Sequence, residues 1–254
     1  MIIDVHAHIL DTGYPVESTT TVNASEMVHA MDRHGISEMW VSPATAFVRD
    51  FVASNKYQYD FFKQTNYSRF RNYAVFNPYF PNETSEEIKR CFEEYGFDGI
   101  KIHNWMQGIL PHQKPLYDII EASIKYHVPV LFHDGTPPYS DTLQLSAIAE
   151  MYPEAKILLG HSGLYDSYRA AIQAANTHNN IWLVLIGPTV GDMEEIIVKS
   201  RRDRLLFGTD YCFGGGDWKG ESLILDRIDI VKSACKNENV FNQIMFQNAL
   251  DLIT

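Results

Sequence analysis

The residues whose spacing first points to chemistry are two histidines one residue apart, His6 and His8. Alternate side chains of a β-strand point to one face, so imidazoles at positions i and i+2 lie together. Further along, His133, His161 and Asp210 each follow a short apolar run. Two imidazoles, one further imidazole and one carboxylate suit a divalent metal ion: Zn²⁺ first, with Mn²⁺, Fe²⁺ or Co²⁺ as alternatives. Such an ion activates water at neutral pH, so the sequence predicts a metal-dependent enzyme.

The elements that must position these residues are short β-rich runs that alternate with helical patterns. The expected strands cover residues 2–6, 38–42, 71–77, 99–103, 129–133, 156–161, 181–186 and 205–209. The expected helices cover residues 24–34, 51–70, 85–95, 116–126, 142–151, 164–178, 192–201, 223–234 and 239–252. Eight such strands in 254 residues predict a single α/β domain, residues 1–254, folded as a (β/α)8 TIM barrel. An open doubly wound sheet is the alternative, but the first strand leads into two histidines instead of a glycine-rich phosphate turn.

In a TIM barrel the chemistry lies at the carboxyl ends of the strands, and the polar residues of this sequence recur there. The motifs around them resemble the amidohydrolase superfamily: IDVHAH at residues 3–8, GIKIH at 99–103, LGHSG at 159–163 and FGTDY at 207–211. They are most similar to the amidohydrolase-2 branch, which includes aminocarboxymuconate-semialdehyde decarboxylase-like enzymes, lactonases and hydratases. The segment 246–250 also resembles the closing helix of that branch.

The resemblance implies a role for each residue of the predicted centre. His6, His8, His133 and Asp210 would hold one metal ion. His161 would stand beside that ion as a general acid or base, or as an electrophile toward the substrate. Asp210 would also take a proton from the metal-bound water, which fits the chemistry of a carboxylate that touches such a water.

Lys101 has three interpretations. In some members of the superfamily a lysine on the fourth strand is carboxylated and bridges two metal ions, and His133 and His161 would then bind the second ion. An ammonium group at Lys101 would instead pair with Asp210 or orient a substrate anion. We expect one metal ion, because the branch that this chain resembles usually holds one.

Several further residues are candidates for lining the substrate pocket, and each is as compatible with packing; they are His103, Trp105, Asn77 and Tyr211. Asp4 shares a strand face with His6 and should point into the barrel. A buried carboxylate needs partners, which would be a ligand histidine, backbone groups or a lysine.

The predicted function is hydrolysis by a metal-activated water that attacks a small-molecule amide, ester or lactone. The alternative is a lyase, a decarboxylase or hydratase, that acts on a small carboxylate at the same site. An arginine near the barrel mouth would favour the lyase, because guanidinium binds carboxylate well. Arg49 and Arg169 are the sequence candidates, and neither is compelling.

The net charge and the residue composition limit the partners and the cellular compartment that we expect for this protein. The formal net charge of -11 disfavours nucleic acid as a partner, so a small molecule is the expected substrate. We expect no membrane segment, and three cysteines without a CxxC pair fit a reducing cytoplasm. The aromatic-rich residues 47–80 would be partly exposed, which suggests a homodimer.

Overall fold

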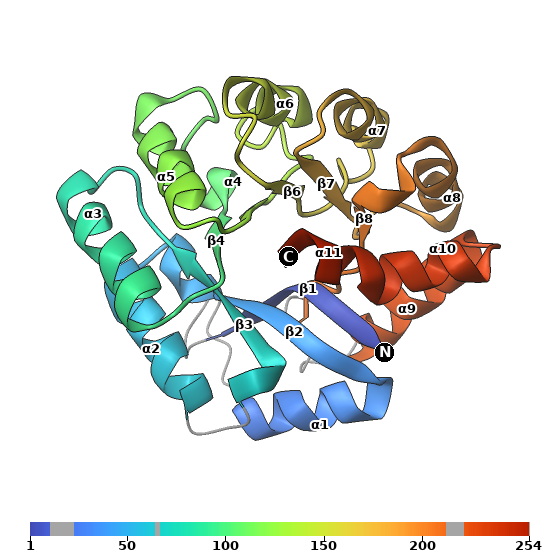
Figure 1. Ribbon diagram of the computed structural model, residues 1–254, viewed down its shortest axis with the longest axis horizontal. Coiled ribbons are helices and arrows are strands. Elements are labelled where there is room, and N and C mark those ends of the chain that lie inside the picture. The colour runs from blue at the N-terminus through green and yellow to red at the C-terminus, as the bar shows by residue number, and fades with distance from the viewer. Residues whose placement is uncertain (11–22, 64–66, 212–220, 254) are drawn as a thin grey trace.

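Eight parallel strands, hydrogen-bonded in the order of the chain, form the predicted TIM barrel (Figure 1). The computed structural model describes residues 1–10, 23–63, 67–211 and 221–253. The strands are β1 (Ile2–Ile9), β2 (Ile36–Pro43), β3 (Phe70–Val75), β4 (Gly99–Ile102), β5 (Val130–Phe132), β6 (Ile157–Leu159), β7 (Ile181–Val184) and β8 (Leu205–Leu206). The predicted fold class is confirmed, and each strand lies where an alternating β-rich run predicted one.

The barrel closes because the segment after β8 returns to β1. The Val5 N–H donates to the Phe207 carbonyl at 3.0 Å, and the His8 N–H donates to the Tyr211 carbonyl at 2.7 Å. The Asp210 N–H donates to the carbonyl of His6 at 2.8 Å. These bonds bring His6 and His8 to the same edge of the barrel as Asp210.

Helices lie around the outside of the strands, except α11, which lies across one end of the barrel (Figure 1). They are α1 (Ala24–His34), α2 (Phe51–Lys63), α3 (Pro81–Lys89), α4 (Asn104–Gln107), α5 (Lys114–Lys125), α6 (Thr142–Met151), α7 (Tyr168–Thr177), α8 (Val190–Lys199), α9 (Glu221–Ala234), α10 (Glu238–Asn242) and α11 (Asn248–Ile253). Several begin at a side-chain cap: Asn23 and Glu26 form a capping box, and Asp141 caps α6. No helix within the described residues has both the length and the apolar character that a bilayer crossing requires.

The interior of the barrel is filled by apolar side chains drawn from strands on all its sides. Val5 belongs to this interior cluster, whereas strict alternation along β1 would have placed it outside with Ala7. The pairing of β1 with β2 shifts register between Asp4 and Ala7, and such an irregularity changes which face a residue occupies.

The end of the barrel away from the polar residues is covered by α11, whose label lies at the centre of Figure 1. Asn248 starts this helix, is 3 % exposed, and donates through Nδ2 to the carbonyls of Arg202 and Leu205 at 2.7 and 2.8 Å. The sequence predicted one helix over 239–252. In the structure a π-helical turn, Gln243–Gln247, separates α10 from α11.

Replacing Asn248 with alanine should lower the free energy of unfolding by about 1–3 kcal/mol, because the buried Leu205 carbonyl and the partly buried Arg202 carbonyl lose their donor. Chemical denaturation followed by circular dichroism measures this change. Asn242→Ala, an exposed position on α10, is the matched control and should change stability by less than about 0.5 kcal/mol. Equal stability of the two variants would contradict a role for Asn248 in fastening the closing helix.

The aromatic stretch that prompted the homodimer prediction is mostly inside the protein. Phe47, Phe51, Phe62 and Phe76 are at most 5 % exposed, whereas Tyr79 and Phe80 are each 50 % exposed. A homodimer stays a prediction. The exposed aromatic side chains of this stretch that support it are Tyr79 and Phe80, in the loop after β3.

Candidate metal centre and active site

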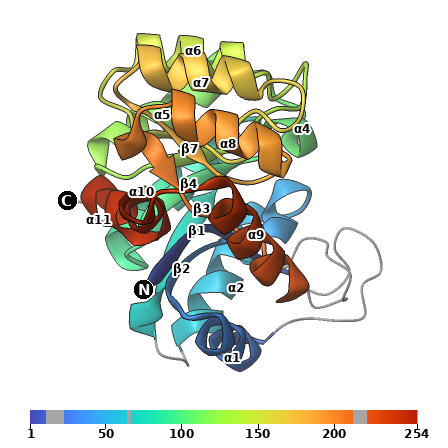
Figure 2. The same ribbon diagram turned by 90° about the vertical axis from the view of Figure 1, so that its right-hand side faces the viewer.

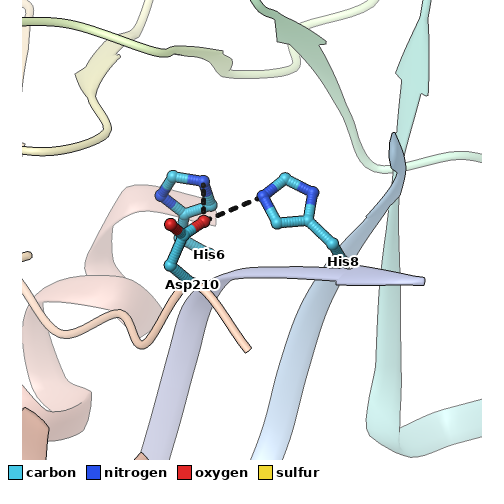
Figure 3. Close-up of side chains that lie close together, drawn as sticks. All are labelled: His6, His8 and Asp210. Carbon is cyan, nitrogen blue, oxygen red and sulfur yellow. Dashed lines mark hydrogen bonds and ion pairs between the residues drawn. The ribbon is translucent and has the colours of Figure 1, made fainter. Parts of the chain in front are cut away.

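Three of the predicted metal ligands meet at the carboxyl ends of the strands (Figure 3). The Nε2 atoms of His6 and His8 lie 3.4 and 3.0 Å from Oδ1 of Asp210. Both imidazoles are almost fully buried, and the Asp210 side chain is 24 % exposed. The two histidines project from β1, and Asp210 follows β8, so the closure of the barrel creates the cluster.

The donor atoms fit a divalent ion in both spacing and chemistry. Ligands bound at 2.0–2.1 Å in a tetrahedron lie roughly 3.3 Å apart, close to the two separations found here. His6 Nδ1 lies 3.0 Å from the carbonyl of Gly160, and His8 Nδ1 lies 2.8 Å from Oγ of Ser42. An Nδ1–H that donates to these oxygens leaves Nε2 of both rings with a lone pair for a metal ion.

Replacing Ser42 with alanine should weaken metal binding by about 10- to 100-fold, because the His8 ring loses the partner that fixes its orientation and tautomer. Titration of the metal-free protein with Mn²⁺ or Zn²⁺ measures the affinity. Ser37→Ala is the matched control on the same strand, since the Ser37 hydroxyl donates to the Ile2 carbonyl at the opposite end of the barrel. An unchanged affinity in Ser42→Ala would remove Ser42 from the metal centre.

The charges of the three side chains suit ligation at neutral pH. Burial lowers the pKa of both His6 and His8, although the Asp210 carboxylate opposes this shift. Burial would raise the pKa of Asp210, but the hydrogen bond with His8 and the nearby imidazoles outweigh it and hold this pKa well below its usual value. Two neutral imidazoles and one carboxylate are the forms that bind a divalent cation.

Asp4 supports the segment that carries Asp210. Its Oδ1 accepts from the backbone N–H groups of His6 and Thr209, each at 3.1 Å, and its Oδ2 accepts from the Thr209 hydroxyl at 2.6 Å. Burial raises the Asp4 pKa to about 7, against these hydrogen bonds. Of the partners considered for Asp4, backbone groups and a hydroxyl are the ones found. Asp210 itself has a φ of 63°, a left-handed conformation that is uncommon outside glycine and that recurs at functional sites.

His161 lies beside the cluster, and Asp134 holds the turn that carries it. The His161 ring stands edge-on to His6 with centroids 5.1 Å apart. Asp134 accepts from the backbone N–H groups of His161 and Gly163, both at 2.6 Å. Burial lowers the pKa of His161 to about 4, so this imidazole is neutral at rest.

His133 lies on the other side of His161, with ring centroids 4.4 Å apart. Its ring stacks on His103 at 4.1 Å, and its Nε2 lies 2.9 Å from the Thr136 hydroxyl. Its ligand atoms are not among those that gather within 4.8 Å of one another around His6, His8 and Asp210. A metal bond from His133 therefore stays a prediction, and the structure places this residue at the edge of the centre.

Lys101 is fully buried, with Nζ 2.9 Å from Nε2 of His6. Burial lowers its pKa to about 7, although the carboxylates of Asp210 and Asp134 oppose the shift. Among the described residues no ion pair joins Lys101 to Asp210 within 4.0 Å. An uncharged amine is the form that takes up CO₂ to give a carbamate. A centre with one metal ion and a centre with two ions bridged by a carboxylated Lys101 therefore both stay predictions.

The pocket candidates separate into two groups. The His103 ring stacks on His133, and Trp105, 53 % exposed, lies 6.5 Å from the same ring between centroids. Asn77 lines a cavity of about 700 Å³ beside the centre. Tyr211 is buried in the cluster of Ala7, Met27 and Ile224 under α1 and α9, so the structure does not bring its side chain to the centre.

The cavity beside the centre lies between the loops that follow β2, β3 and β4. Phe47 forms its inner wall, because the Phe47 ring also faces His8 and His103 at 5.9 and 5.0 Å. The other lining residues include Arg49, Phe51, Phe80 and Met106. Asp50 and Glu83 also line it, so the cavity offers both apolar and charged surface next to the metal ligands.

Several supporting residues were not assigned from the sequence. They all lie at strand ends, and this position is the sequence feature that could have identified them; they are Ser42, Gly160, Thr209 and Asp134. A side chain added at Gly160 would place Cβ 2.5 Å from the Phe132 carbonyl and 3.0 Å from the His6 ring. Glycine is thus required here chiefly by the close approach of the Phe132 carbonyl, and the ligand histidine tightens the same space.

Comparison with known proteins shows the family to which this chain belongs. A family model described as Amidohydrolase matches residues 3–253. A γ-resorcylate decarboxylase from Polaromonas sp. strain JS666 is 26 % identical over 249 residues, covering 73 % of this chain and 76 % of the relative.

Solved structures share the fold over almost the full length. The 2,6-dihydroxybenzoate decarboxylase of Rhizobium has a TM-score of 0.76 at 16 % identity, covering 99 % of this chain and 98 % of its own. A dihydroxybenzoic acid decarboxylase of Polaromonas sp. JS666, with manganese and the inhibitor 2-nitroresorcinol bound, has a TM-score of 0.73 at 19 % identity, covering 99 % of this chain and 96 % of its own.

Proposed function

Because this chain belongs to the amidohydrolase family, we propose that it is a metal-dependent lyase that removes CO₂ from a small carboxylic acid. The observation that carries the proposal is the cluster of His6, His8 and Asp210 with the neutral His161 beside it. The decarboxylases among its relatives, one with manganese bound, support this reaction over the hydrolysis expected first from the sequence.

The residues that would hold the ion are His6, His8 and Asp210, with His133 as the predicted fourth. A divalent cation held there would supply the positive charge that stabilises the electrons left on the substrate when CO₂ departs. Manganese and zinc both suit nitrogen and oxygen ligands, so the donor set does not choose between them.

The reaction R–COO⁻ + H⁺ → R–H + CO₂ needs one proton at the carbon that loses the carboxylate. We assign the transfer of that proton to His161, which is neutral at rest and would take up one proton from solvent before giving it to the carbon. Its ring lies beside the ligand rings, and its backbone N–H is held by Asp134. Its burial also keeps bulk water away from the carbanion-like carbon. Phe47 and the adjoining cavity would orient an apolar or aromatic body of the substrate.

The test is CO₂ release by the manganese-loaded protein from a panel of hydroxybenzoates and unsaturated aliphatic acids. In D₂O we expect one deuterium on the carbon that lost CO₂, detected by NMR. The His6→Ala chain, which lacks a donor, is the control and should release none. Hydrolysis of a lactone, ester or amide, without CO₂ release from any acid, would contradict the proposed lyase activity and support a hydrolase.

A further inference from the structure

One aromatic ring stands where the metal centre meets the adjoining cavity. It belongs to Phe47, the last residue of a short 3₁₀-helix, Ala44–Phe47, that follows β2. The Phe47 ring lies edge-on to the ring of His8 and tilted against that of His103, with centroids 5.9 and 5.0 Å apart. The same side chain lines the cavity of about 700 Å³. The centre and the cavity therefore adjoin at this ring.

The Phe47 ring is held in place by its surroundings. All four residues of its 3₁₀-helix are at most 2 % exposed. The backbone turns back directly after the ring, because the N–H groups of Val48 and Arg49 both donate to the Thr45 carbonyl, at 3.2 and 3.0 Å. The ring also belongs to the same apolar cluster as Phe51 at the start of α2. Side chains packed this closely keep one rotamer, so the ring forms a fixed boundary.

The cavity extends from Phe47 to the surface of the protein. Val48 and Phe80 also line it, and their side chains are 51 and 50 % exposed, whereas Phe47 is buried at its inner end. Met106 of α4 lines it as well, and Figure 2 shows α4 at the end of the barrel opposite α11. A volume of about 700 Å³ is typical of pockets that bind small organic molecules. The cavity therefore has room for a further part of a ligand, provided that the ligand can pass Phe47.

We propose that Phe47 sets the size of the acid that this site accepts, because its ring limits how far the body of the acid reaches from the metal centre into the cavity. The inference rests on the proposed function for the place where the substrate binds. It adds the residue that makes the site selective for compact acids with a single ring. A smaller side chain at this position would widen the connection between the two spaces and let a second ring enter.

The experiment compares Phe47→Ala and Phe47→Leu with Phe51→Ala, each loaded with Mn²⁺ and checked for the wild-type circular dichroism spectrum. Phe51 lines the same cavity and is 5 % exposed, but no ring contact joins it to a histidine within the described part of the chain. Its truncation enlarges the cavity away from the metal centre. Calorimetric titration measures the Kd of benzoate, which has one ring, and of biphenyl-3-carboxylate and biphenyl-4-carboxylate, which have two.

We expect Phe47→Ala to shift the ratio of the two-ring Kd to the benzoate Kd by at least about tenfold in favour of one of the two-ring acids, because a second ring then buries apolar surface. Phe47→Leu should shift the ratio in the same direction by less, since part of the side-chain volume remains. Phe51→Ala should keep the ratio within about twofold of the wild-type value.

The inference is overturned if neither Phe47 variant changes the ratio, or if Phe51→Ala changes it as much as Phe47→Ala does. It is also overturned if the wild type binds a two-ring acid as tightly as benzoate, or binds none of the three acids. The CO₂ assay separates this result from the proposed reaction. CO₂ release with unchanged size selectivity in both Phe47 variants would remove the role of Phe47 and leave the decarboxylase. A shifted ratio without CO₂ release from any acid would leave Phe47 as the size-limiting residue and remove the decarboxylase.

Discussion

Protein carrying Asp210→Asn will retain its fold but lose its metal ion, and kcat/KM will fall by at least about 1000-fold. Asparagine has the same shape and tolerates the left-handed backbone at this position, where φ is 63°. The amide removes the negative charge that partners two neutral imidazoles. Metal per chain after dialysis, measured by mass spectrometry, and turnover of the decarboxylated substrate are the two readouts.

Asp203→Asn is the control for that variant, because Asp203 precedes β8, is 52 % exposed in its side chain and pairs only with surface arginines within the described chain. It should keep both metal and activity. One ion per chain together with full turnover in Asp210→Asn would exclude Asp210 as a ligand.

The second large effect is expected from His161→Gln, which should lower kcat by about 100- to 10,000-fold while the metal content stays at the wild-type level. His161 lies beside the three ligand residues and not among them, so its loss removes proton transfer without removing a donor atom. The exposed His112 provides the control variant His112→Gln.

His133→Gln is the informative companion of that change, because the sequence assigns His133 to the metal and the structure places it at the edge of the centre. Metal loss in His133→Gln but not in His161→Gln supports the predicted assignment. Metal loss in His161→Gln would instead make His161 a ligand and leave the reaction without its proposed proton carrier.

The barrel could be predicted from the sequence because its signals are local. Each strand is a short β-rich run, and each connection is a helical pattern, so their alternation alone specifies parallel strands. The same logic located His6 and His8, because residues two apart on a strand share a face. Asp210 followed from the rule that chemistry lies at the carboxyl ends of barrel strands.

The rest depended on irregular backbone and on contacts between distant segments. The register shift in β1 moves Val5 inward, and nothing in the residue types announces it. Helix α7 begins at Tyr168, later than predicted, because Ser162, Gly163 and Leu164 have positive φ angles and form turns after β6.

The bonds that close the barrel link β1 to the segment after β8, and this has a consequence for biosynthesis. A nascent chain contains His6 and His8 about two hundred residues before Asp210 has been made. Incomplete chains therefore offer two imidazoles without the anion that retains a cation. Metal capture should thus follow the docking of the last strand on the first, and retained metal then reports that the barrel has closed.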